Sequence, residues 1–76
     1  MGFPTIDMAA TGRNIADMRK KAGMTVRDLQ DILGFNTPQA IFKWMRGDAV
    51  PTLDNLVILA DILDMPIDKI IIVTRI

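Results

Sequence analysis

The segment TVRDLQDILGFNTPQAIFKWMRG, residues 25–47, decides the fold. It contains two short stretches of helical periodicity, residues 26–33 and 38–46, each preceded by a threonine and followed by a glycine. Threonine is favoured as a helix N-cap, and glycine readily adopts the left-handed conformation that ends a helix. Only four residues separate the two stretches. We therefore predict two short helices that meet at a steep angle and need a further helix to cover their apolar faces.

Helical periodicity continues on both sides of this pair. It predicts a helix over residues 12–22 capped by Thr11, and another over residues 53–64 capped by Thr52. A fifth helix is expected from Pro66 to about residue 73, where β-branched residues make the end helical or extended. The prediction is an all-α fold: one compact five-helix domain over residues 1–76, with a short extended N-terminal arm at residues 1–10 and an apolar C-terminal tail.

The composition excludes several classes of function. The 76 residues include no Cys and no His, and Ser and Glu are also missing, so all nine acidic residues are Asp. The chain therefore lacks most of the side chains used for nucleophilic catalysis, general acid–base catalysis and the usual zinc sites. Of the catalytic residue types, only Asp, Thr and Lys remain. We therefore expect no enzyme, no metal site, no cofactor and no small-molecule ligand. No apolar run approaches the roughly 20 residues of a membrane span, and we find no export signal, so we expect a cytoplasmic protein without membrane partners.

Charge divides the chain into two unlike halves although the net charge is zero. Residues 1–46 carry seven basic and four acidic side chains, a net charge of +3. Residues 47–76 carry two basic and five acidic side chains, a net charge of −3. This asymmetry indicates one surface for a polyanion and another surface for something else.

Three blocks of sequence together resemble the lambda-repressor-like helix-turn-helix family, also called the XRE family. They are MTVRDL through ILGF at residues 24–35, IFKWMRG at residues 41–47 and PTLDNL at residues 51–56. The resemblance covers residues 11–72 and implies that the helix at about residues 38–46 enters the major groove of double-stranded DNA, within a helix-turn-helix unit at about residues 25–46. It implies a transcriptional regulator of repressor type that binds DNA sequence-specifically and occupies an operator without catalysis.

The resemblance also implies which residues meet DNA. Gln39 and Lys43 are the expected base readers, since Gln can pair with adenine and Lys with guanine. Phe42 either contacts a thymine methyl group or is a plain surface aromatic. The full base-reading set is Thr37, Pro38, Gln39, Ala40, Phe42 and Lys43. Phosphates are expected at the N-terminus of the helix after Thr25, and at Arg13, Arg27 and Arg46.

The sequence departs from the family pattern at several positions. The usual phosphate-gripping Gln is Val26 here, and the small residue where the two helices cross is Gln30. Arg19 lacks the Glu with which many family members pair it, because Met45 stands there, so we expect Arg19 to bind Asp48 or a phosphate. These changes predict weak nonspecific affinity for DNA and a need for two subunits.

The second half of the chain carries more apolar residues than one subunit needs. On the helix at 53–64 the core face is expected to hold Leu53, Leu56, Val57, Leu59, Ala60 and Leu63. This leaves Ile58 and Ile62 as a second, exposed stripe. Together with the tail, this predicts a homodimer interface. Its residues are Ile58, Ile62, Ile71, Ile72 and Ile76. Folding of the tail or of the arm over the stripe within one chain is the alternative.

The sequence is also compatible with a second function. The same fold can serve as a protein-interaction module of antitoxin or anti-repressor type with little DNA binding. The acidic second half favours that alternative, and salt-sensitive DNA binding distinguishes the two.

Overall fold

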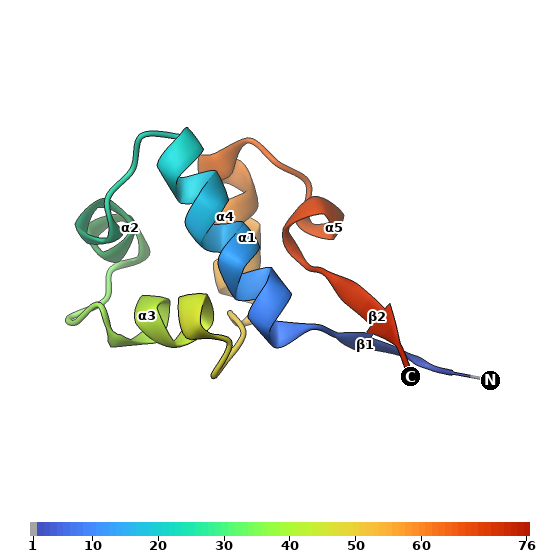
Figure 1. The fold of residues 1–76 in the computed structure, drawn as a ribbon. Coiled ribbons are helices and arrows are strands. Elements are labelled where there is room, and N and C mark those ends of the chain that lie inside the picture. The colour runs from blue at the N-terminus through green and yellow to red at the C-terminus, as the bar shows by residue number, and fades with distance from the viewer. Residues whose placement is uncertain (1) are drawn as a thin grey trace.

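The computed structural model describes residues 2–76 and places five helices and two short strands within them. The elements are β1 (Pro4–Ile6), α1 (Met8–Lys21), α2 (Val26–Leu33), α3 (Gln39–Arg46), α4 (Leu53–Leu63), α5 (Ile67–Ile70) and β2 (Val73–Arg75). Figure 1 shows α1 and α4 in the middle, α2 and α3 at one end, and the two strands at the other end with both chain termini. The predicted mainly helical fold is confirmed, with a small two-stranded sheet in addition.

Three of the four helix boundaries in the decisive segment follow the predicted caps, the start of α3 being the exception. Thr25 accepts a hydrogen bond from Asp28 N, and the Asp28 carboxylate accepts one from Thr25 N, which completes a capping box. Gly34 and Gly47 end α2 and α3 with φ angles of 72° and 81°. A side chain at either position would adopt this left-handed conformation at a cost, so the glycines stop the helices where the sequence indicates.

The first helix begins earlier than predicted. Asp7, not Thr11, is the N-cap, and its carboxylate accepts a hydrogen bond from Ala10 N at 2.9 Å. The intervening Met-Ala-Ala residues are good helix formers, so the helix extends back to the first strong cap. The predicted arm is thus shortened to the residues before Asp7, and Met1 lies outside the described residues. Thr11 is a buried residue inside α1.

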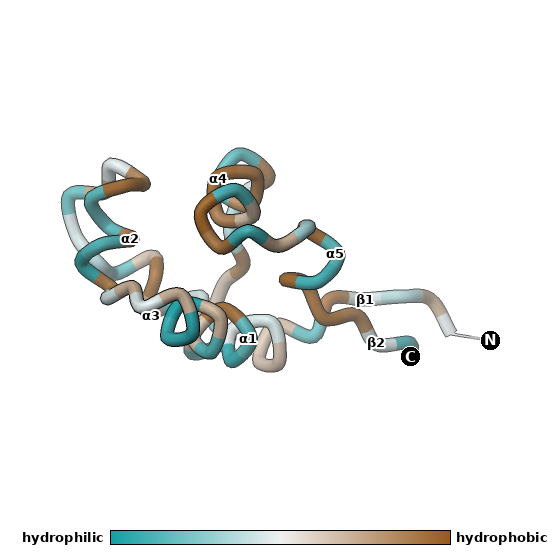
Figure 2. The backbone as a smooth tube through the Cα atoms, turned by 90° about the horizontal axis from the view of Figure 1, so that it is seen from above, coloured by the Kyte–Doolittle hydropathy of each residue, from teal (hydrophilic) through white to brown (hydrophobic). Residues whose placement is uncertain are grey.

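The arm and the tail pair with each other. β1 and β2 form an antiparallel ribbon with Pro4 opposite Arg75, Thr5 opposite Thr74 and Ile6 opposite Val73. The fifth helix therefore spans only Ile67–Ile70, since the β-branched residues after it are extended in the ribbon. Figures 1 and 2 both show the ribbon projecting from the helices, so it does not fold over α4.

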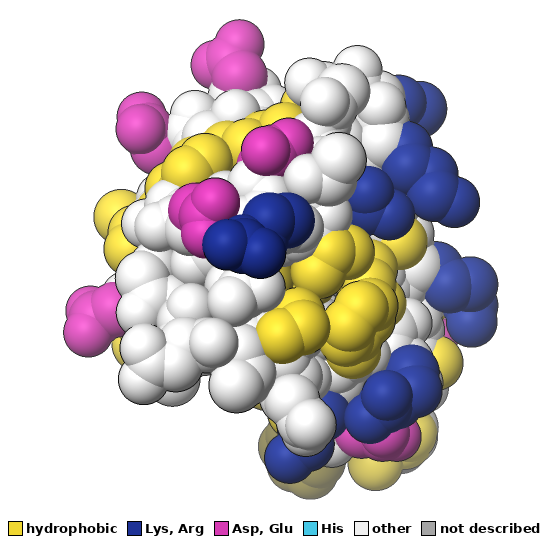
Figure 3. Space-filling model, turned by 90° about the vertical axis from the view of Figure 1, so that its left-hand side faces the viewer, with side chains coloured by type: hydrophobic (Ala, Val, Ile, Leu, Met, Phe, Trp, Pro, Cys, Tyr) yellow, Lys and Arg dark blue, Asp and Glu magenta, His cyan; other side chains and the backbone are white. Residues whose placement is uncertain are grey.

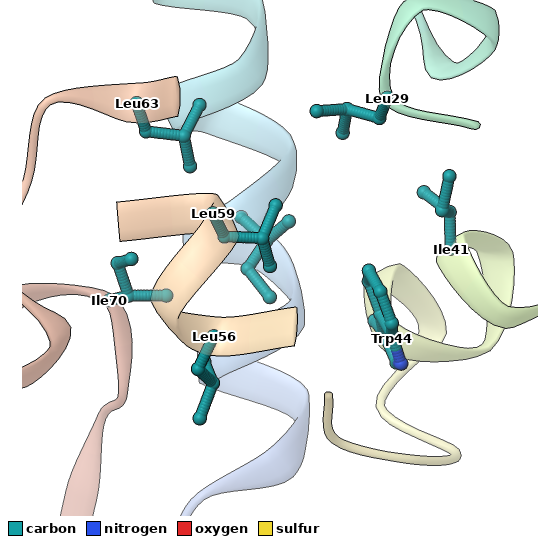
Figure 4. Close-up of a cluster of buried hydrophobic side chains, with 8 residues drawn as sticks. Leu29, Ile41, Trp44, Leu56, Leu59, Leu63 and Ile70 are labelled. Carbon is teal, nitrogen blue, oxygen red and sulfur yellow. The ribbon is translucent and has the colours of Figure 1, made fainter. Parts of the chain in front are cut away.

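The core lies between the helices and includes Trp44, as expected for a ring in the same helical phase as Ile41 (Figure 4). The Phe35 ring meets the Trp44 ring edge-on with centroids 5.8 Å apart. The buried apolar residues come from all five helices and are Ile15, Leu29, Ile41, Trp44, Leu56, Leu59, Leu63 and Ile70.

The core-facing side of α4 was predicted correctly at Leu56, Leu59, Ala60 and Leu63 but wrongly at Leu53 and Val57. Leu53 and Val57 are 77% and 59% exposed, whereas Ile62 packs against the core. At 100° per residue, the buried positions 56, 59 and 63 centre the core face away from Val57 and toward Ile62. Ile71 also packs against the core, so two of the five residues predicted for the dimer interface are partly buried within one chain.

Two helices approach closely at Gly12, where α1 crosses α3. Gly12 is buried, and a Cβ atom added to it would overlap the carbonyl oxygen of Trp44 and lie 2.9 Å from that of Met45. The end of α3 approaches α1 at Gly47 too, where an added Cβ would lie 2.8 Å from the Cα of Ala9. Close approach of two backbones therefore fixes α3 on α1.

We predict that Gly12→Ala destabilises the domain by about 3 kcal/mol, the upper end of the usual cost of overpacking, because backbone atoms must move. Gly23→Ala is the control: no heavy atom lies within 4 Å of its added Cβ, and its φ of 71° leaves only the left-handed strain of about 1 kcal/mol. Urea unfolding followed by Trp44 fluorescence measures both. Equal costs for the two variants would contradict close packing at Gly12.

Candidate nucleic-acid interface

The turn between α2 and α3 is held by hydrogen bonds to Phe35. Phe35 N donates to Gln30 O at 3.0 Å, and the Gln30 side-chain amide donates to Phe35 O at 3.3 Å. The Phe35 ring then packs on Trp44 of α3. Gln30, which replaces the small residue of the family pattern, therefore braces the turn and couples it to α3.

The helix α3 begins one residue later than predicted. Pro38 is its N-cap and supplies no side-chain hydrogen bond to the helix, while Gln39 N donates to Thr37 Oγ at 3.5 Å. Thr37 and Pro38 consequently lie in the turn that leads into the helix. Both remain at its N-terminal end, beside Gln39.

One side of α3 is exposed along its whole length. Gln39, Phe42, Lys43 and Arg46 are all exposed, whereas Ile41 and Trp44 are buried. The exposed positions follow the i, i+3, i+4, i+7 spacing of a single helix face. Ala40 is half-buried and packs against the core, so it differs from the other predicted base readers.

A shallow groove runs beside this face. It is lined by Thr37, Pro38, Gln39, Phe42 and Arg46. Phe42 is 41% exposed, so its ring is available to a contacting apolar group. Figure 3, which views the α2 and α3 end of the molecule, shows hydrophobic side chains in the middle of the face and Lys and Arg side chains along its right side. The surface thus combines apolar, amide and cationic groups.

Two of the predicted phosphate-binding arginines are held by carboxylates. Arg27 Nε lies 3.1 Å from Asp31, and Arg46 Nε lies 3.0 Å from Asp48. All four side chains are well exposed, so these ion pairs contribute little to stability and can open for another anion. Arg13 and Lys43 are exposed and make no ion pair with any residue between 2 and 76. The spacing of Arg27 and Asp31, four residues apart on a helix, could have indicated their pairing from the sequence.

The N-terminus of α2 is less open to an anion than the sequence suggested. The capping box uses the Thr25 N–H and Oγ, and hydrogen bonds from the Thr25 backbone and side chain lower the pKa of Asp28. Its carboxylate therefore stays charged at neutral pH beside the amides that a phosphate would approach. Thr25 is exposed, but its hydrogen-bonding groups are engaged within the helix cap.

Arg19 is not free, contrary to the expectation from the sequence. Its guanidinium Nη1 donates to Met24 O at 2.8 Å, in the loop between α1 and α2. Arg19 therefore helps to position the start of α2. Asp48 pairs with Arg46 instead.

The fold is similar to the folds of two solved structures. The restriction-modification controller protein C.AhdI from Aeromonas hydrophila is 22% identical, with a TM-score of 0.73 over 84% of this chain and 96% of that chain. The DNA-binding domain of BldD is 18% identical, with a TM-score of 0.69 over 86% of this chain and 93% of that chain. A search of curated protein sequences gives no significant match.

The structure describes no helix within residues 2–76 that is long and apolar enough to span a bilayer.

The profile of the helix-turn-helix family matches residues 15–70, which include α2, α3, α4 and α5. The chain therefore belongs to the lambda-repressor-like, or XRE-type, helix-turn-helix family of DNA-binding transcription regulators.

Proposed function

We propose that this protein binds double-stranded DNA sequence-specifically and represses transcription in the cytoplasm by occupying an operator. The observation that carries the proposal is the exposed face of α3, where Gln39, Phe42, Lys43 and Arg46 share one side while the opposite side is buried. A helix of this kind fits the major groove with its N-terminal residues toward the base edges.

The roles within this face follow from the chemistry of each side chain. The Gln39 amide pairs with adenine N6 and N7, and the Lys43 ammonium donates to guanine O6 and N7. Phe42, beside Pro38 and Thr37, meets a thymine methyl group. Ala40 contributes less than the others because it is half-buried.

Arg13, Arg27 and Arg46 contact phosphates and set the register of the protein on the duplex. Arg27 and Arg46 must first leave Asp31 and Asp48, whose carboxylates also repel the backbone of DNA. This internal competition supports weak nonspecific binding, and therefore the need for a homodimer on a twofold-symmetric site.

We predict that Gln39→Ala and Lys43→Ala each weaken binding to a selected DNA site by about 1–3 kcal/mol and leave the fold intact, because both side chains are exposed. The site is first obtained by selection from random duplexes, and fluorescence titration gives the affinities. Lys69→Ala in α5 is the matched control for Lys43→Ala, since it removes the same charge from an exposed position away from α3. Losses equal to that of the control would refute the base-reading role.

We predict that Asp48→Asn strengthens binding to DNA of any sequence, because Arg46 loses its intramolecular partner and becomes available to a phosphate. One additional phosphate contact makes the slope of log K against log salt steeper by up to about 0.9. Asp61→Asn, at an exposed position of α4, makes the same change in net charge and serves as the control. A salt slope unchanged from wild type, or changed equally by the control, contradicts the competition between Asp48 and DNA. If no DNA shows salt-sensitive binding, the protein-interaction alternative replaces the proposal.

A further inference from the structure

The ribbon of β1 and β2 is exposed along both of its strands. All six strand residues are exposed, and Figures 1 and 2 show the ribbon standing away from the helices. Phe3, Val73 and Ile76 are 80%, 55% and 82% exposed. An isolated two-stranded ribbon is marginally stable in water, and its outer edges present unpaired backbone groups to another strand.

The hydrogen bonds at the two ends of the ribbon show which backbone groups point outward. Asp7 N donates to Ile72 O at 2.8 Å, and Ile76 N donates to Phe3 O at 3.2 Å. In an antiparallel ribbon, directly opposite residues alternate between hydrogen-bonded and non-hydrogen-bonded pairs. The pair of Thr5 and Thr74 lies midway between the two bonded pairs, so the N–H and C=O groups of both threonines point toward the other strand. The N–H and C=O groups of Val73 and Arg75 therefore face away from β1, and no residue between 2 and 76 hydrogen-bonds to them.

The two outer edges of the ribbon are not equivalent. On the β1 edge the corresponding outward residues are Pro4 and Ile6, and Pro4 has no N–H group to donate. The β2 edge offers a donor and an acceptor at both Val73 and Arg75. Proline on an edge strand discourages further pairing, so the β1 edge is protected and the β2 edge is open.

Side chains of α1 hold the backbone that leads into the open β2 strand. Ile72 N donates to Thr11 Oγ at 2.9 Å, and the Asn14 side-chain amide donates to Lys69 O at 2.8 Å and to Ile70 O at 2.9 Å. Thr11 and Asn14 both belong to α1, and Thr11 is 1% exposed. The start of β2 is thus fixed to the helical body, which lowers the entropy lost when another strand pairs with it.

We propose that β2 pairs with β2 of a second copy of this chain, antiparallel, to form a four-stranded sheet in the order β1–β2–β2–β1. Antiparallel pairing of identical strands is twofold symmetric, so the edge is complementary to itself. With Thr74 opposite its counterpart, Val73 lies opposite Arg75 of the other copy, and each such pair exchanges both backbone hydrogen bonds. This register joins two threonines, a favourable cross-strand pair, and avoids placing two arginines opposite each other.

The same pairing closes at two copies, because Pro4 stands on both outer edges of the resulting sheet. The proposal deepens the homodimer of the proposed function, but it concerns the free protein and is tested without DNA. Of the residues predicted for the dimer interface, Ile72 and Ile76 lie at the proposed strand pairing, whereas Ile58 of α4 lies outside it.

Cross-linking tests the register directly, since the chain has no cysteine of its own. Cα atoms of a non-hydrogen-bonded antiparallel pair lie about 4.5 Å apart, within the range that a disulfide spans. Thr74→Cys should therefore form a disulfide-linked dimer under mild oxidation in the absence of DNA. Thr5→Cys is the matched control, because Thr5 lies opposite Thr74 on the protected strand, one strand farther from the second copy. Cross-linking of Thr74→Cys no faster than Thr5→Cys overturns the proposal.

Sedimentation equilibrium of the uncross-linked protein provides the second measurement. Val73→Pro removes only an outward N–H group, so it should raise the dimer dissociation constant at least tenfold. Ile6→Pro makes the same change at the residue paired with Val73 on the β1 edge and should leave the dimer intact. Helical circular dichroism and Trp44 fluorescence confirm that each variant is folded. A wild-type monomer at hundreds of micromolar, or a dimer broken by Ile58→Asp but not by Val73→Pro, overturns the proposal.

Discussion

The close contact of α1 with α3 at Gly12 determines the geometry on which the rest of the structure depends. Without a side chain at this position, the carbonyl groups at the end of α3 pack directly on the backbone of α1. Ile41 and Trp44 then turn into the core, which leaves Gln39 and Lys43 on the outer side of α3. The exposed face of α3 is therefore a consequence of which side of the helix is buried. The same part of α1 also fixes the tail, because Thr11 and Asn14, on either side of Gly12 in the sequence, bind the backbone between Lys69 and Ile72.

Carboxylates accompany the basic groups around α2 and α3. Asp31 and Asp48 hold two arginines of the recognition region, and Asp28 occupies the N-terminus of α2. A regulator built in this way gains affinity from matching base contacts and from a second subunit more than from general attraction to phosphates. In the proposed dimer the open edge of β2 supplies that subunit, and this edge lies at the opposite end of the molecule from α2 (Figure 1).

The sequence predicted the helix-turn-helix unit because its signals are local: Thr25, Gly34 and Gly47 act through the backbone within a few residues. It also placed Trp44 in the core. It missed the ribbon, because pairing of Thr5 with Thr74 joins residues at opposite ends of the chain and has no local signature. The buried face of α4 was assigned toward Leu53 and Val57, since a helix apolar on most sides does not specify its own orientation. The exposed positions of α3 were predictable from periodicity, whereas the partners of Arg19 and Arg46 depended on how loops approach them.

Amide chemical-shift mapping by nuclear magnetic resonance tests the central claim, that the outer face of α3 is the surface that meets DNA. The protein labelled with nitrogen-15 is titrated with a duplex obtained by selection. The account predicts that the largest shifts lie at residues 37–46, with smaller shifts near Arg13 and Arg27 and almost none in the middle of α4. Shifts concentrated on α4 and α5, with α3 unaffected, would contradict it.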